Sequence, residues 1–147
     1  MSQFPPALLP CTRELGKKYA NFIFDCDGVL WNASSAIPKA PEFLKFLKEN
    51  EKRVYFVTNN GMSTRAEYKA KIKKLLDFDT EEDRIYTSSY LAAQYIKLKH
   101  PEFKSAFVLG MDALCYELEQ IGLKVTGGHE HDNKYGLTYD EIRNIPF

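Results

Sequence analysis

The sequence predicts an α/β fold built on a mainly parallel sheet with flanking helices. Three short apolar runs, residues 22–24, 54–57 and 106–109, alternate with segments of helical period. Such runs indicate strands that are buried on both faces, as in parallel sheets. The first two runs and the helical segment between them span about 35 residues, which is the size of a right-handed βαβ unit. Because ligands bind beyond the carboxyl ends of parallel strands, the residues that follow each run are the first candidates for a site.

The composition is that of a globular protein of about one domain. Of the 147 residues, 44% are hydrophobic and 27% are charged, which fits neither a disordered chain nor a membrane protein. Twenty basic and twenty acidic residues leave no net charge, so no overall field attracts nucleic acid or an anionic membrane. We therefore expect neither as a partner, and we expect the function to reside in a local site.

The cysteines and the apolar stretches indicate a reducing compartment. Three scattered cysteines, an odd number, do not suit a disulfide framework. The apolar stretch over residues 7–9 is shorter than the core of a signal peptide. No window approaches the ~20 apolar residues that span a bilayer. The sequence thus predicts a cytoplasmic protein.

Two segments of different character follow from the residue pattern. Residues 1–18, with prolines at positions 5, 6 and 10, are expected to form an N-terminal arm or an irregular lead-in. Residues 19–147 are expected to form a single α/β unit with further helices and short strands. The helices are expected over 40–50, 64–76, 89–99 and 112–121, and the short strands over 85–87 and 123–126. Thr64 and Glu67 match a capping box at the start of the second helix.

Two carboxylates stand at the end of the first apolar run. Asp25 and Asp27 lie two residues apart, so in an extended backbone their side chains point the same way and Cys26 faces the opposite side. Two adjacent carboxylates repel each other unless a cation or a shared proton compensates. Oxygen ligands alone favour Mg²⁺, which keeps several waters and accepts phosphate oxygens. Asp25 and Asp27 are therefore candidate metal ligands, and Gly28 allows a sharp turn just beyond them.

The second apolar run ends in the tetrapeptide VTNN, residues 57–60. The βαβ geometry places this end beside the first, at the same edge of the sheet. Thr58 offers a hydroxyl, Asn59 and Asn60 offer amides, and the positive end of the following helix points toward this edge. A phosphate group would be held there. An asparagine pair alone also fits a simple turn, so the prediction depends on both motifs together.

These motifs resemble the haloacid dehalogenase superfamily of phosphatases, and more closely its 4-nitrophenylphosphatase and phosphoglycolate phosphatase group. The residues that carry the resemblance are FDCDGVLW, VTNNGMSTRAEYKAKI and IYTSSYLAAQYI, and the match runs from about Tyr19 to Gly128. The resemblance implies a partial haloacid dehalogenase-like, Rossmann-like core, of which residues 19–147 are the N-terminal portion. Too few residues separate Asp25 from Thr58 for an inserted cap domain, so the cap is absent here and belongs after residues 106–121.

The resemblance also assigns roles to the residues at the predicted edge. Asp25 would be the nucleophile that forms an aspartyl-phosphate, and Asp27 the general acid and base. Mg²⁺ would bind a carboxylate oxygen of Asp25 and the backbone carbonyl of Asp27. Thr58, with backbone groups of Asn59 and Asn60, would bind the substrate phosphate. Relatives mostly have serine where Gly61 stands, which leaves contacts from that position open.

The family's phosphate-clamping lysine and its late acidic metal motif have no counterpart in this sequence. The function implied is therefore a magnesium-dependent phosphatase acting on a small phosphorylated metabolite, with these residues as its N-terminal half and inactive alone. A non-catalytic phosphate-binding or regulatory fragment is the alternative. A receiver domain fits less well, because its acidic pair and its acceptor lie on different strands. An unpaired edge of the first strand would favour a homodimer or a completing chain.

Several other residues have both a functional and a structural interpretation. His129 and His131 lie in a glycine-flanked loop without further ligands, which favours a structural role over zinc binding. Asp112 could add a metal ligand at the same edge, but it equally suits the first turn of a helix. Cys26 fits a small buried residue better than a redox sensor. The lysines of the 64–76 helix are expected on its solvated face; they are Lys69, Lys71, Lys73 and Lys74.

Overall fold

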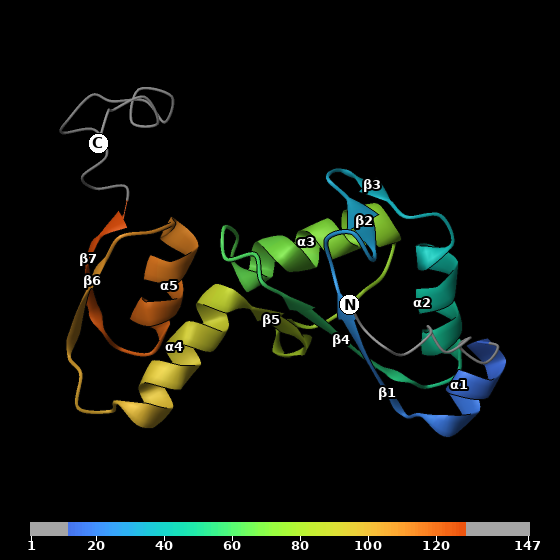
Figure 1. Cartoon of the computed structure of the whole chain (residues 1–147), viewed down its shortest axis with the longest axis horizontal. Helices are drawn as coiled ribbons and strands as arrows, with labels where there is room; N and C mark the ends of the chain where they lie inside the picture. The colour runs from blue at the N-terminus through green and yellow to red at the C-terminus, as the bar shows by residue number, and fades with distance from the viewer. Residues whose placement is uncertain (1–11, 129–147) are drawn as a thin grey trace, which may run out of the picture.

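The computed structural model describes residues 12–128 and is built around a three-stranded parallel sheet (Figure 1). The strand order is β1-β4-β5, with β1 at Asn21–Asp25, β4 at Arg53–Thr58 and β5 at Ile85–Thr87. Phe22 pairs with Val54 and Asp25 with Val57 along β1 and β4. The fold class predicted from the sequence is confirmed, and so is the adjacency of the first two apolar runs.

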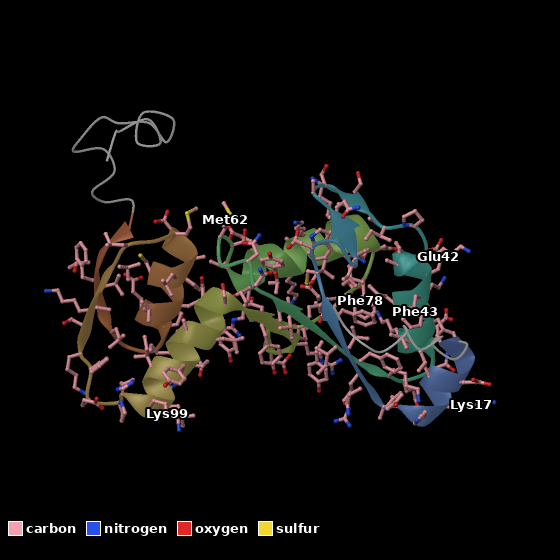
Figure 2. The ribbon with its side chains drawn as sticks, in the orientation of Figure 1. Lys17, Glu42, Phe43, Met62, Phe78 and Lys99 are labelled. Carbon is pink, nitrogen blue, oxygen red and sulfur yellow. The ribbon has the colours of Figure 1, made fainter. Side chains whose placement is uncertain are left out.

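Two helices cover one face of this sheet and build the main core. They are α2, Ala40–Glu49, and α3, Arg65–Leu76. Leu44 and Leu47 of α2 and Ile72 of α3 are fully buried, together with Phe56 of the central strand. Phe43 lies edge-on to the rings of Phe22 and Phe24, and Phe78 lies edge-on to Phe56. Figure 2 places Phe43 and Phe78 between α2 and the strands.

The N-terminal segment is more regular than its prolines suggest. Thr12–Lys18 forms helix α1, so these residues are not an irregular lead-in, and residues 1–11 lie outside the described part. Gly16 is buried, and a Cβ added there would lie 3.4 Å from the Phe46 ring of α2. Gly16 therefore lies against the Phe46 ring at ordinary contact distance, a neighbour that a residue-by-residue pattern could not reveal.

A second, smaller unit follows in the chain (Figure 1). A 3₁₀ turn, η1, spans Glu82–Arg84, and the unit itself comprises α4, β6, α5 and β7. Their bounds are Ser88–Lys99, Ser105–Val108, Asp112–Gln120 and Lys124–Gly127. Strands β6 and β7 pair in parallel, in a sheet separate from β1-β4-β5. Ala93, Val108, Leu118 and Leu123 form a core of their own.

The strands are less buried than the apolar runs predict. Ile23 is 70% exposed, Phe107 is 66% exposed and Leu109 is 90% exposed. Within residues 12–128, helices α2 and α3 both pack into the cluster on one face of β1 and β4, while side chains such as Ile23 lie open on the other. The prediction of strands buried on both faces is therefore wrong, although the strands themselves are where it placed them. The same described residues contain no helix long and apolar enough to cross a bilayer.

Candidate active site at the carboxyl ends of β1 and β4

The two predicted motifs meet at one edge of the sheet. Asp25 is the last residue of β1 and is in register with Val57, so Thr58 lies one position further along β4. Thr58 is in turn paired with Thr87, the last residue of β5. The carboxyl ends of all three strands therefore stand side by side, as the βαβ arrangement predicts.

The aspartate pair sits on a tight turn. Asp25 and Asp27 are exposed, whereas Cys26 between them is fully buried. The backbone N–H of Cys26 donates a 2.8 Å hydrogen bond to Oδ1 of Asp25. Gly28 has a φ of 82°, a left-handed conformation that favours glycine, and its N–H donates to the Trp31 carbonyl at 2.7 Å. The turn then leads into the short hairpin of β2, Trp31–Asn32, and β3, Ser35–Ala36.

Asp27 has two partners that the sequence did not indicate. The indole N–H of Trp31 donates a 2.8 Å hydrogen bond to Oδ1 of Asp27. The ammonium of Lys71 lies 3.8 Å from the same oxygen and 4.7 Å from the centre of the Trp31 ring. Placing Lys71 on the solvated face of its helix was therefore wrong. Its spacing from the inward-facing Tyr68, three residues before it, is the signal that could have found it.

The other lysines that pair on this helix follow the prediction. Lys69 contacts Glu81 at 2.7 Å and Lys73 contacts Asp77 at 2.8 Å, and all four side chains are largely exposed. These pairs lie on the surface and include neither Asp25 nor Asp27.

Thr58 shares the edge but is enclosed within it. Its side chain is only 3% exposed. Its hydroxyl accepts a 3.1 Å hydrogen bond from the Asn60 backbone N–H, and a further hydrogen bond joins it to the Tyr68 hydroxyl. Because side chains alternate along a strand, Thr58 projects toward α3 while Asp25 lies on the more open side. The structure brings these residues to one edge with unequal access to solvent.

The segment after β4 forms a compact loop. Asn60 Oδ1 accepts a 2.8 Å hydrogen bond from the Met62 N–H, and Asn59 is exposed. Met62 is 64% exposed and lies at the outer end of this loop (Figure 2).

Gly61 lies against the start of α4. The hydroxyl of Ser89 donates a 2.8 Å hydrogen bond to the Gly61 carbonyl. A Cβ at position 61 would meet Oγ of Ser88 at 2.6 Å and Oγ of Ser89 at 2.7 Å. A side chain at position 61 would therefore require the Ser88 and Ser89 hydroxyls to move.

The N-terminus of α3 is already capped from within the chain. The N–H of Glu67 donates to Oγ1 of Thr64 at 3.3 Å, and the Thr64 N–H donates to the Glu67 carboxylate at 2.7 Å. The capping box predicted from the sequence is thus confirmed. Because the Glu67 carboxylate already stands at this helix end, the end offers less to a bound phosphate than an uncapped helix would.

The aspartates dominate the electrostatics of the edge. Burial raises the pKa of the Cys26 thiol to about 12, Asp25 and Asp27 add to the rise, and Lys71 opposes it. Burial also raises the pKa of Tyr68, while its hydrogen bond with Thr58 lowers it and the two aspartates raise it further. Two buried groups therefore respond to both carboxylates, although the carboxylates themselves are exposed.

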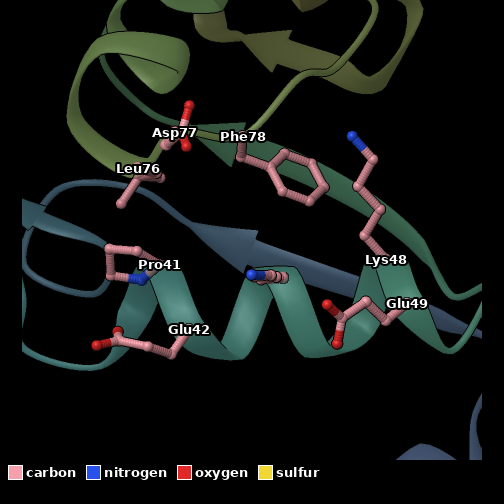
Figure 3. Close-up of a pocket in the computed structure, with 8 residues that line it drawn as sticks. Pro41, Glu42, Lys48, Glu49, Leu76, Asp77 and Phe78 are labelled. Carbon is pink, nitrogen blue, oxygen red and sulfur yellow. The ribbon is translucent and has the colours of Figure 1, made fainter.

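Two other candidate residues do not join the site. Asp112 follows β6, which belongs to the separate β6-β7 sheet, and it stands in the first turn of α5; of its two interpretations, the helix-start one is confirmed and the shared edge with Asp25 is not. His129 and His131 lie outside the described residues. A pocket of about 580 Å³ opens elsewhere, between α2 and the segment Leu76–Phe78 (Figure 3). None of its lining residues belongs to the two motifs.

Comparison with known proteins identifies the family. The model of the haloacid dehalogenase-like hydrolases matches residues 22–124, which include both motifs. The chain belongs to this family. It is 35% identical to a 4-nitrophenylphosphatase of Schizosaccharomyces pombe over 90% of its length, and 39% identical to the chloroplastic phosphoglycolate phosphatase 1A of Arabidopsis thaliana over 73%. The solved p-nitrophenyl phosphatase of Archaeoglobus fulgidus superposes with a TM-score of 0.66 at 31% identity, over 73% of the chain.

The chain spans less than half the length of these relatives. It covers 45% of the yeast protein, 30% of the plant protein and 40% of the archaeal structure. The likeness therefore concerns a part of a haloacid dehalogenase-like fold, in agreement with the partial core expected from the sequence.

The donor atoms at the edge fit magnesium, but they do not enclose it. Among residues 12–128 no three acidic, histidine or cysteine side chains gather closely enough to hold a metal ion. Two exposed carboxylates at one turn suit an ion that keeps several waters and takes further oxygens from a phosphate. Asp25 and Asp27 are the residues that would hold it.

Proposed function

We propose that this chain forms the N-terminal part of a magnesium-dependent phosphatase that hydrolyses phosphate monoesters. The observation that carries the proposal is the pair of exposed carboxylates at the end of β1, beside the end of β4. The yeast and plant relatives are both named as phosphatases of such esters, and the names differ in the organic group that carries the phosphate. We therefore expect the substrate to be a small phosphorylated metabolite. A cytoplasmic location remains our expectation.

The reaction would proceed in two displacements through Asp25. One carboxylate oxygen of Asp25, oriented by the Cys26 N–H, attacks phosphorus and forms an aspartyl-phosphate as the ester oxygen leaves. Asp27 donates a proton to that leaving oxygen and then takes one from the water that cleaves the aspartyl-phosphate. Bound Mg²⁺ would neutralise negative charge on the phosphoryl oxygens.

Thr58, Asn59 and Asn60 would bind the transferred phosphoryl group. The Thr58 hydroxyl and the Asn60 N–H are hydrogen-bonded to each other in this structure. Phosphate binding would therefore require this segment to exchange its internal hydrogen bonds for bonds to the phosphoryl oxygens.

We further propose that these 147 residues turn over substrate negligibly by themselves. The phosphate-clamping lysine and the later acidic motif have no counterpart in the sequence, and losses of this kind are each worth ~3 to 5 kcal/mol in the barrier. Within residues 12–128, β1 is an edge strand of its sheet, and a second copy or a completing chain would pair there. The alternative, a non-catalytic phosphate-binding or regulatory fragment, is favoured by the same lack of late motifs.

Binding and turnover measured together test the proposal. We expect isothermal titration to detect Mg²⁺ and orthovanadate binding that Asp25→Asn abolishes, with no turnover of p-nitrophenyl phosphate above that variant. No binding would contradict the proposed function. Turnover that requires both magnesium and Asp25 would contradict the expected inactivity while supporting the chemistry.

A fusion separates the phosphatase from the binding fragment. The chain would be joined to the part of the Schizosaccharomyces pombe relative that lies beyond the matched region. Turnover by this fusion, lost in its Asp25→Asn counterpart, is the result expected for a phosphatase. A folded fusion that binds vanadate without turnover would instead support the non-catalytic alternative.

A further inference from the structure

Asp27 is held by a cationic and aromatic cluster that the reaction outlined above does not use. The cluster consists of Trp31, Tyr68 and Lys71, and it comes from two separate segments, the start of β2 and helix α3. Trp31 is fully buried and Tyr68 is 2% exposed. The cluster therefore forms a fixed wall on one side of Asp27.

The Lys71 ammonium lies within this wall. It is 3.8 Å from Oδ1 of Asp27, 4.7 Å from the centre of the Trp31 ring and 5.9 Å from the centre of the Tyr68 ring. Such distances are typical of cation–π contact. The Lys71 side chain is 35% exposed, against 51% for Lys73 on the same helix. Lys71 thus packs on two rings, whereas Lys69 and Lys73 pair with acidic side chains at the surface.

The indole N–H and the ammonium converge on one carboxylate oxygen. Trp31 Nε1 is 2.8 Å from Oδ1, the atom that Lys71 also faces. With Oδ1 held, the second oxygen of Asp27 is the one left to exchange a proton. The positive charge also compensates part of the repulsion between Asp25 and Asp27.

We propose that Lys71 is the built-in counter-charge of the aspartate pair and, together with Trp31, a positioning residue for Asp27. The proposal rests on the proposed function, because it concerns the same site. A fixed positive charge there opposes the binding of a dication and favours the binding of a phosphate-like anion. Removing the charge should therefore change the two affinities in opposite directions, which damage to the fold would not do.

Isothermal titration of the whole chain measures both affinities. We expect Lys71→Gln to bind Mg²⁺ about three- to tenfold more tightly and orthovanadate, at saturating Mg²⁺, about three- to tenfold more weakly. Lys71→Arg keeps the charge and should stay near the wild type in both. Lys69→Gln, a matched loss of charge on the exposed side of the same helix, should change neither. Weakening of both ligands, or no change in either, would overturn the proposal.

The single tryptophan supplies a second readout that needs no ligand. Trp31 is the only tryptophan in the chain, and it contacts both Asp27 and Lys71. We expect Lys71→Gln and Asp27→Asn each to alter its fluorescence, and the double variant to match either single one, because the two residues act on the indole as one unit. Unchanged emission, or fully additive changes, would overturn the positioning role. If the wild-type chain binds neither ligand, the proposed function fails and this fluorescence comparison still decides the role of Lys71.

Discussion

At the residue scale, the pKa of Cys26 is shifted by burial beside two carboxylates. The thiol is fully buried, and its pKa is raised to about 12 from the ordinary value of 9.0. Desolvation is the main cause, and the charges of Asp25 and Asp27 act in the same direction. The thiol is therefore inert near neutral pH, in agreement with its interpretation as a small buried residue.

This shift predicts a loss of stability at high pH. The unfolded chain releases the thiol proton near pH 9, whereas the folded chain keeps it until about pH 12. Stability is thus fully present below pH 9 and falls between these values, with a limiting slope of about 1.4 kcal/mol per pH unit. Urea denaturation under reducing conditions, repeated from neutral pH to well above pH 9, measures this loss. The free energy of unfolding should fall less steeply with pH in Cys26→Ala than in the wild type. Equal slopes in both proteins would contradict the shift.

Single-residue roles were only partly accessible from the sequence. The position of Asp25 and Asp27 followed from the end of an apolar run, because strand ends and turns are local features. The Lys71 contact was missed because it joins Asp27 to a helix more than 40 positions later, and the Trp31 contact because the turn that brings Trp31 back to Asp27 leaves no periodic pattern in the sequence. Gly61 departs from the pattern of the family that the sequence resembles, but its close neighbours in α4 appear only in three dimensions.

At the element scale, the start of α3 depends on a reciprocal pair of hydrogen bonds. Thr64 accepts from the Glu67 N–H, and the Glu67 carboxylate accepts from the Thr64 N–H. We expect Thr64→Ala to lower the free energy of unfolding by about 1 kcal/mol. Thr64→Ser keeps the hydroxyl and should lie within a few tenths of a kcal/mol of the wild type. Urea denaturation measures both, and equal losses in the two variants would argue against the cap.

Elements were predicted well, and their surroundings were not. Helix α3 and strand β4 lie where capping signals and apolar runs placed them. The burial of the strands was overestimated. A continuous apolar run shows that a strand can be covered on both faces, but not that helices are present to cover the second face. Ile23 is the clearest case, since it belongs to such a run and is 70% exposed. Pairing of β6 with β7, apart from the main sheet, likewise depends on long-range contacts.

At the scale of the whole molecule, a buried ion pair helps to join the two cores. Arg65 begins α3, and its Nε lies 3.2 Å from Oε1 of Glu117 in α5. The Arg65 guanidinium also lies 3.9 Å from the centre of the Tyr90 ring in α4 and donates to the Glu82 carbonyl. Glu117 is 1% exposed, so its charge depends on this partner. The contact links the helix over the main sheet to both helices of the smaller unit.

Removing only one partner of this ion pair should lower the free energy of unfolding far more than replacing both partners by apolar residues. Arg65→Met leaves the Glu117 carboxylate buried without a counter-charge, and we expect it to lower the free energy of unfolding by about 3 kcal/mol. The double variant Arg65→Met with Glu117→Leu removes both charges and should recover most of that loss. Lys73→Gln, which breaks an exposed pair on the same helix, should have no measurable effect. Urea denaturation followed by circular dichroism compares the three. A double variant as unstable as Arg65→Met would mean that the arginine acts through its packing on Tyr90 rather than through its charge.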